Sequence, residues 1–226
     1  MISEEILKIL YILNSMSKDK IFLVGGAIRD SFLKIKPEDL DFSIEGAALN
    51  FAESNGAKLK NLRVLSRYFN SCSFEIDGFQ ITLSSAREDI YLGNKLVNIR
   101  RANIKKDLLR RDFKVNAMAL TTEGELLDPL GGIKDLKERE LNLIERGSFA
   151  KDPSRLVRAC RHSHRCGLVF SKELEEEFWK SLPLLDAQKG RGRVEKEIEL
   201  AKKRLKDIQQ NKYFNEIVRI VGHNLV

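Results

Sequence analysis

The chain has 226 residues, of which 42% are hydrophobic and 32% are charged, and its formal net charge is +7. This composition is typical of a globular protein with one large or two small domains, and no apolar run reaches the roughly 18 residues that span a bilayer. Three cysteines do not make a disulfide framework, and the basic charge is compatible with RNA, DNA or a membrane surface.

Hydrophobic periodicity predicts a mixture of helices and strands in the first part of the chain. In chain order these are a helix over 3–14, a strand over 21–24, a helix over 27–33, and strands over 40–44, 57–65, 71–76 and 79–84. Residues 85–104 show no clear period and are expected to form a loop. A helix is then expected over 106–117, followed by a hairpin of 118–120 with 125–127.

The second part of the chain shows a helical pattern. From about residue 146 the strand signal disappears, and helices are predicted over 152–167, 171–181, 193–208 and 212–221. We therefore expect an α+β fold, with an α/β domain over residues 1–145 and a small all-helical domain over 146–226. The short polar segment Glu145-Arg146-Gly147 is the expected hinge.

Asp39 and Asp41 are the central chemical signal. In a strand, residues i and i+2 point to the same face, so the two carboxylates would lie several ångströms apart. A divalent metal would relieve their mutual repulsion, and Mg²⁺ prefers such oxygen ligands together with substrate phosphates. An isolated Asp-x-Asp is usually a solvated strand edge, so its surroundings decide the interpretation.

A pair of glycines supplies those surroundings. Gly25-Gly26 lies between a predicted strand and a predicted helix, fourteen residues before Asp39. Glycines there would let backbone N–H groups approach a triphosphate, and Arg29 would add a charge-assisted contact. Without Asp39 and Asp41, the glycine pair would equally well be a tight strand-to-helix turn.

Five segments resemble, in order, the motifs of the bacterial and eukaryotic tRNA nucleotidyltransferase and poly(A) polymerase family. They are Leu23 to Asp30 with Asp39-Leu40-Asp41, Arg110 to Ala117, Asp128 to Leu136, Asp152 to Ala159, and the pair Arg193 and Glu197. The resemblance spans residues 21 to about 200. It implies a polymerase-β-like nucleotidyltransferase head, a mixed sheet with helices, followed by a helical neck that recognises the nucleotide base and contacts RNA.

The resemblance also implies site residues. Asp39 and Asp41 would be catalytic and hold Mg²⁺, with two ions expected. Gly25, Gly26 and Arg29 would bind the triphosphate; Arg111, Asp112 and Asn116 the ribose; Asp152, Arg155 and Arg158 the base, supported by Arg193 and Glu197. Arginine donates hydrogen bonds and an ionised aspartate accepts them, so an Arg–Asp pair suits the base edges of C or A, which carry both donors and acceptors. Asp152 would also serve as a helix N-cap before Pro153.

Three features depart from the family pattern. Thr82 stands where a third carboxylate is usual, and Lys151 stands where an acidic residue usually precedes Asp152. After the neck-like helices only Tyr213 to Val226 remain. We therefore expect a short form without the family's body and tail, which would grip less of the RNA, form a homo-oligomer or use a helper protein.

These observations together predict a template-independent RNA 3′-terminal nucleotidyltransferase. It would add C, A or both from CTP or ATP to the 3′ end of tRNA or a tRNA-like RNA. A poly(A) polymerase and a non-catalytic RNA- or nucleotide-binding module remain as alternatives. The first residues lack the pattern of a secretory signal, so we expect a cytoplasmic location and no membrane partner.

Overall fold

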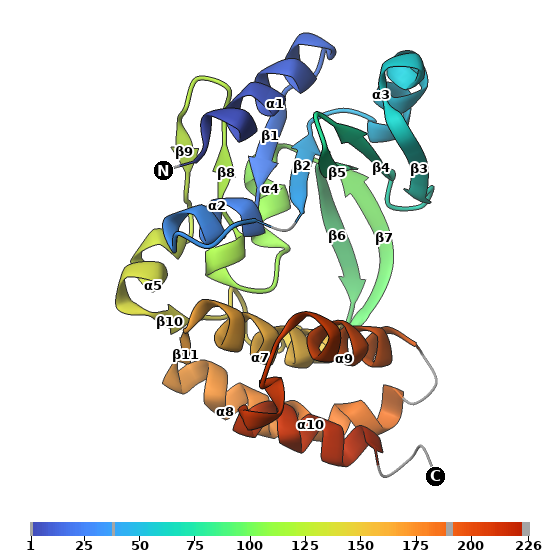
Figure 1. Ribbon diagram of the computed structural model, residues 1–226. Coiled ribbons are helices and arrows are strands. Elements are labelled where there is room, and N and C mark those ends of the chain that lie inside the picture. Colours follow the sequence, from blue (N-terminus) through green and yellow to red (C-terminus); the bar gives the residue numbers. More distant parts are fainter. Residues whose placement is uncertain (1, 38, 189–191, 223–226) are drawn as a thin grey trace. The chain divides into compact units, whose positions relative to one another are not determined.

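The computed structural model describes residues 2–37, 39–188 and 192–222 (Figure 1). The chain divides into two compact units, Met1–Ile133 and Lys134–Val226. Helices and strands mix in the first unit and helices dominate the second, which confirms the expected α+β class. The division lies earlier in the chain than the boundary expected at residue 145, and the roles expected for the two domains stay predictions.

A seven-stranded mixed sheet organises the first unit, with strand order β3-β4-β5-β2-β1-β8-β9 (Figure 1). The strands are β1 (Ile21–Val24), β2 (Leu40–Ile44), β3 (Lys60–Ser66), β4 (Ser71–Ile76), β5 (Phe79–Ser85), β8 (Ala119–Leu120) and β9 (Leu126–Leu127). β2 and β5 run parallel, and the other neighbouring strands of this sheet run antiparallel. Asp77 and Gly78 join β4 to β5 with φ angles of 51° and 81°, as a tight hairpin requires.

The two faces of this sheet differ in character. On one face, helix α3 (Ala48–Asn55) packs over β4, where the Phe51 ring stacks on Phe74 and the Cys72 thiol approaches the Ala48 carbonyl. Because side chains alternate along a strand, Ser73 of β4 points to the opposite face. That opposite face carries the polar residues of interest for function.

The remaining helices of the first unit surround the sheet. They are α1 (Glu4–Ser15), capped by the Ser3 hydroxyl, α2 (Gly26–Phe32) and α4 (Ile104–Leu109), with 3₁₀ turns at Gly56–Lys58 and Lys114–Asn116. The helix expected over 106–117 is therefore wrong in its second half. There the Asp112 carboxylate accepts a hydrogen bond from the Phe113 N–H, and such local side-chain bonds compete with helix continuation.

The loop expected over 85–104 is a β-hairpin instead. β6 (Arg87–Leu92) and β7 (Lys95–Arg101) pair antiparallel as a separate two-stranded sheet (Figure 1). Neither strand buries one face completely, so the sequence shows no apolar alternation. Its cross-strand pairs mix charged, polar and apolar residues, as with Glu88 opposite Arg100 and Ile90 opposite Asn98, so the strands show no regular alternation in the sequence.

The second unit is helical with one short exception. Its helices are α5 (Gly132–Glu138), which starts in the first unit, α6 (Ser148–Lys151), α7 (Ser154–Cys166), α8 (Lys172–Ser181), α9 (Arg193–Arg204) and α10 (Lys212–Gly222), with 3₁₀ turns at Leu182–Gln188 and Ile208–Gln210. β10 (Glu140–Leu141) and β11 (Val169–Phe170) pair in parallel, so the all-helical expectation is wrong at 169–170. Two-residue strands are too short to show a period.

The core of the second unit contains a cluster of aromatic rings. Phe170 stacks on Tyr213 with ring centroids 4.1 Å apart, and Phe178 meets Tyr213 edge-on at 5.1 Å.

The hinge expected at Glu145-Arg146-Gly147 lies inside this unit, where the Gly147 N–H donates to Glu177. None of the helices in the described ranges combines the length and apolarity needed to cross a bilayer.

We expect Gly132→Ala to destabilise the first unit. A Cβ at this position would lie 2.4 Å from the Lys114 carbonyl oxygen, which is rigid backbone. Overpacking of this kind costs about 1–3 kcal/mol, measurable as a lower urea midpoint at unchanged slope. The matched control is Gly56→Ala, whose nearest neighbour is a Leu62 methyl at 3.9 Å. Equal stability losses in the two variants would contradict the close approach.

Candidate active site

The pairing of β1 with β2 brings the carboxylates beside the glycine turn. Val24 is opposite Asp41 in this antiparallel pair, so Gly25 follows directly beside the start of β2. Gly25 has a φ of 71°, and its N–H donates to the Met118 carbonyl at 3.1 Å as α2 begins. Asp39 and Asp41 are both exposed. The structure thus gathers the residues predicted to bind metal and those predicted to bind triphosphate.

Thr82 is the direct neighbour of Asp41. The parallel pairing of β2 and β5 places these two residues opposite each other, with Thr82 half-buried. Glu75 of β4 lies on the same face of the sheet as Thr82, and its carboxylate accepts a hydrogen bond from the Asn61 side chain at 2.9 Å. Within the described ranges, no group of three or more His, Cys, Asp or Glu side chains is arranged to hold a metal ion.

The donor set nevertheless suits Mg²⁺. Asp39 and Asp41 are carboxylates two residues apart in the chain, with Asp41 in β2 and Asp39 at a bend just before it. Both are exposed, so water and substrate phosphates have access to them. Mg²⁺ is commonly bound by one or two carboxylates and completes its shell with water and phosphate oxygens. The pair therefore fits Mg²⁺ shared with a nucleotide.

Arg29 is buried in a hydrogen-bonded chain rather than presented to solvent. Its Nε and Nη2 donate to Asp30 Oδ1 at 2.8 and 2.5 Å, and its Nη1 donates to Asn116 Oδ1 at 2.6 Å. Asn116 in turn donates to Asp112 at 3.0 Å. One chain of contacts thus joins residues predicted to serve the triphosphate and the ribose. With Arg29 only 4% exposed, its direct phosphate contact stays a prediction.

Arg111 lies against the glycine turn. Its Nη1 donates to the Asn116 carbonyl at 3.2 Å, and a Cβ built on Gly25 would approach that same nitrogen to 2.8 Å. The Arg111 Nε is buried and has no hydrogen-bond partner in the described part of the chain. Two features therefore require glycine at position 25: the positive φ and the close approach of the Arg111 guanidinium.

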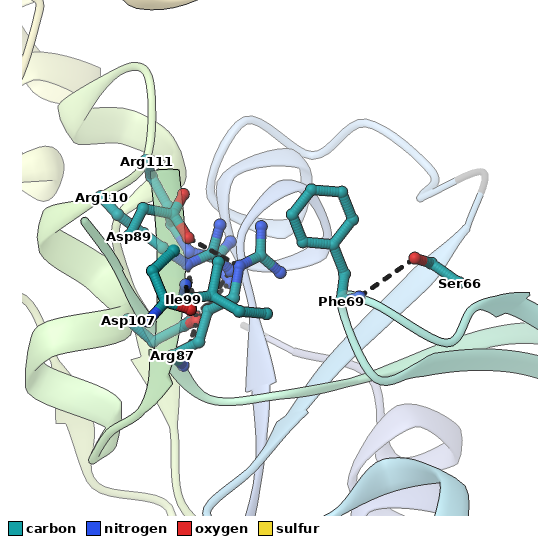
Figure 2. Close-up of polar contacts among 9 residues, drawn as sticks. Ser66, Phe69, Arg87, Asp89, Ile99, Asp107, Arg110 and Arg111 are labelled. Atoms are coloured by element: carbon teal, nitrogen blue, oxygen red, sulfur yellow. Dashed lines mark hydrogen bonds and ion pairs between the residues drawn. The ribbon is translucent and has the colours of Figure 1, made fainter. Parts of the chain in front are cut away.

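Asp107 fixes Arg111 from the other side (Figure 2). This carboxylate is 1% exposed; its Oδ2 accepts from Arg111 Nη2 at 3.1 Å, and its Oδ1 accepts from Arg110 at 2.7 Å and from the Arg87 N–H at 3.2 Å. Burial alone would raise the pKa of Asp107, but the charges of Arg111 and Arg110 and their hydrogen bonds hold it below its ordinary value. Asp107 is therefore ionised at neutral pH.

Sequence analysis did not identify Asp107 as a site residue. The signal was available, because Arg110 and Arg111 follow it at i+3 and i+4 around the end of α4, the spacing of side chains that meet on a helix. Asp30 was missed for a different reason. It adjoins Arg29 in sequence, and nothing in the periodicity shows that both side chains turn inward.

In the second unit, Asp152 and Arg193 come together. Asp152 Oδ2 accepts from Arg193 Nη1 at 3.0 Å, while Oδ1 accepts from the Ser154 N–H at 3.1 Å and its hydroxyl at 2.6 Å. α7 begins at Ser154 with Pro153 at the N-cap, so Asp152 lies one residue before the N-cap position expected from the sequence, although its Oδ1 accepts from the first N–H of the helix. Its charge is also paired, which orients the carboxylate.

Glu197 of α9 holds two arginines of α7. Arg158 Nη1 lies 3.7 Å from Glu197 Oε1, and Arg161 Nη2 lies 3.3 Å from Oε2. The structure thus places Glu197 beside Arg158 and Arg161, and its expected support of base recognition stays a prediction. Lys151, the charge reversal next to Asp152, forms an ion pair with Glu145 at 2.6 Å. The positive charge of Lys151 is therefore balanced by the carboxylate of Glu145.

The geometry agrees with a family comparison. The sequence matches the family described as the poly A polymerase head domain over residues 21–142, more than half of the chain. The chain belongs to this family. The matched region contains the seven-stranded sheet, the glycine turn, Asp39 and Asp41, and the segment from Asp107 to Asn116.

Relatives of this poly A polymerase head-domain chain are similar over more than that region. The A-adding tRNA nucleotidyltransferase of Aquifex aeolicus is 31% identical over 189 residues, covering 80% of this chain and 23% of its own length. The CC-adding tRNA nucleotidyltransferase of Halalkalibacterium halodurans is 31% identical over 178 residues, covering 78% of this chain and 43% of its own. The chain thus spans less than half the length of either relative.

A solved structure shows the same fold. It is a tRNA nucleotidyltransferase complexed with a primer tRNA and an incoming ATP analog. Its TM-score to this chain is 0.72 at 29% sequence identity, over 95% of this chain and 60% of the other. The likeness extends beyond the head-domain family match into the helical second unit.

We expect Asp107→Asn to destabilise the protein at neutral pH. Removing the charge leaves Arg111 and Arg110 without their buried counter-charge, at a cost of about 3 kcal/mol in free energy of unfolding. The folded pKa of Asp107 lies below its ordinary value, so its stabilisation is present above the unfolded pKa of roughly 3.9 and is lost as pH falls through the folded pKa.

Urea unfolding of both proteins between pH 7 and pH 3 measures this difference. The control is Glu88→Gln, which removes a partly exposed surface carboxylate paired with Arg100 and Lys106 and should change stability little. A difference between wild type and Asp107→Asn that stays constant down to pH 3 would contradict the assignment.

Proposed function

We propose that this chain is a template-independent nucleotidyltransferase that adds C, A or both from CTP or ATP to the 3′ end of tRNA. One observation carries the proposal: the pairing of Val24 with Asp41 puts an exposed carboxylate pair beside a glycine turn. The A-adding and CC-adding relatives, and the relative bound to a primer tRNA and an ATP analog, support this choice of substrates.

In the first unit, each group has a distinct task. Asp39 and Asp41 hold Mg²⁺, with two ions expected; such ions neutralise phosphate charge and lower the pKa of a bound hydroxyl. The backbone at Gly25 and Gly26 lies against the triphosphate, since neither residue places a side chain in the way. Arg111, fixed by Asp107, reaches the ribose hydroxyls together with Asp112. The RNA 3′-oxygen bonds to the α-phosphorus and pyrophosphate leaves.

In the second unit, paired charges select the base. Asp152 accepts hydrogen bonds and is oriented by Ser154 and Arg193, while Arg155 and Arg158 donate them. Glu197 holds Arg158 from α9. Such a fixed set of donors and acceptors matches the Watson–Crick edge of C or A without a nucleic-acid template.

We expect Asp41→Asn to abolish nucleotide addition without unfolding the chain. Loss of a ligand that stabilises the transition state by several kcal/mol lowers the rate by roughly 1000-fold or more. The assay uses tRNAs that lack one, two or three 3′-terminal nucleotides, with Mg²⁺ and labelled CTP or ATP, resolved on a sequencing gel. The control is Asp77→Asn, an exposed turn residue.

Each result of that assay separates the candidates. Addition of one to three residues by the wild type supports the proposal, whereas a long tail identifies a poly(A) polymerase. RNA binding without addition identifies a binding module, for which Thr82 beside Asp41 is the first residue to change to Asp. Full activity in Asp41→Asn would refute the site.

We expect Asp152→Ala to reduce discrimination between nucleotides. A hydrogen bond to a charged group contributes about 1.5–3 kcal/mol, so the preference among CTP, ATP, GTP and UTP should fall by roughly 10- to 100-fold. Single-nucleotide incorporation rates measure it. Glu173→Ala, which removes an exposed carboxylate of α8, is the control and should keep the preference. An unchanged preference in Asp152→Ala would exclude Asp152 from base reading.

A further inference from the structure

The edge of the head sheet carries unbalanced positive charge. Residues 54–74 contain four basic residues, Lys58, Lys60, Arg63 and Arg67, and no Asp or Glu. All four side chains are exposed, and none forms an ion pair with another residue of the described ranges. Unpaired, exposed cations on one segment attract a polyanion. Their charge is not used by the fold.

Strand register connects this edge with the carboxylate pair. Arg63 of β3 is opposite Ser73 of β4, Ser73 is opposite Thr82 of β5, and Thr82 is opposite Asp41 of β2. Paired residues point to the same face, so this row runs across four strands on the face away from α3. At about 4.8 Å per strand, Arg63 and Asp41 are roughly 14 Å apart at their Cα atoms.

The surface along this row is polar and open. Ser73 and Thr82 are half-buried hydroxyl residues, and Arg63 and Asp41 at its ends are exposed. Lys60 shares the face of Arg63, because Lys60 is opposite Glu75. Hydroxyls followed by cations suit a chain of phosphodiesters, since both kinds of group bind phosphate oxygens.

The turn beyond β3 is fixed by contacts of Phe69 and carries an exposed arginine and an exposed tyrosine. The Phe69 N–H donates to the Ser66 hydroxyl at 3.0 Å, and the Arg87 guanidinium lies 4.5 Å from the Phe69 ring centroid (Figure 2). The Tyr68 ring lies edge-on to the Phe69 ring, with centroids 4.9 Å apart, and is 55% exposed, while the neighbouring Arg67 is exposed. Exposed aromatic rings beside cations are typical of surfaces that stack single-stranded bases.

We propose that the open face between Asp41 and β3 is the path of the RNA strand that ends at the reacting 3′-hydroxyl, with Lys60 and Arg63 bound to its phosphates. The inference rests on the proposed function for the identity of the RNA. A peptide strand added to the β3 edge is disfavoured, because irregular register in the β3–β4 pair and lysine and arginine on the strand oppose such pairing.

The test measures binding separately from catalysis. A 5′-labelled single-stranded RNA with a free 3′ end is titrated with the full chain at several salt concentrations, followed by fluorescence anisotropy without nucleotide. The double variant Lys60→Gln with Arg63→Gln should bind about tenfold more weakly at 0.15 M salt. The slope of log K against log salt should fall by about 1.4, or about 0.7 for each lost phosphate contact.

Lys18→Gln with Lys20→Gln is the matched control, because both lysines are exposed, lie outside the row and form no described ion pair. It should keep wild-type affinity and slope. Wild-type binding by the Lys60/Arg63 variant, equal losses in the two variants, or no RNA binding by the wild-type chain would each overturn the inference. If the wild type binds RNA through this face but adds no nucleotide, the proposed function fails, and of the inference only the binding of RNA phosphates by Lys60 and Arg63 stands.

Discussion

The register between β1 and β2 is the constraint on which the candidate site depends. With Val24 opposite Asp41, the turn at Gly25 begins where the exposed carboxylates lie. A slip of one residue would turn Asp41 toward the face covered by α3 and Phe42 toward solvent. Since Leu40, Phe42 and Ile44 are all buried, the hydrophobic face opposes that slip. The burial of three apolar side chains thus fixes the position of two polar ones.

Around this strand pair, most charged side chains fix one another before any ligand binds. Arg29 is held by Asp30 and Asn116, and Arg111 is held by Asp107. Burying such charges is costly, and only complete pairing with good hydrogen bonds offsets the cost. The benefit is that a donor reaching a ligand has little side-chain freedom left to lose. Asp39 and Asp41 are exposed, so water and a cation can reach them.

Sequence reasoning succeeded where one short-range rule governed the outcome. Alternation along β2 predicted that Asp41 points to the other face of the sheet from Leu40 and Phe42. The structure confirms this, because Asp41 is exposed and the two apolar residues are buried. The strands at 40–44 and 71–76 were confirmed, and so was the strand at 21–24, which is a continuous run of buried apolar residues. The β6–β7 hairpin was missed because it buries no continuous face, and the 106–117 helix was overextended because Asp112 bonds its own neighbour's backbone. Long-range partners such as Asn116 for Arg29, 87 residues apart in the chain, leave no local pattern.

Gly25 has a consequence for how this sequence can change. Its positive φ and the 2.8 Å approach of Arg111 leave room for only one of the twenty amino acids. Replacement would strain the backbone and displace the guanidinium in the same step. A lineage that no longer needed the ribose contact proposed for Arg111 would be free to lose both residues together. The joint presence or joint loss of Gly25 and Arg111 should therefore distinguish homologous domains that keep this site from those that have lost it.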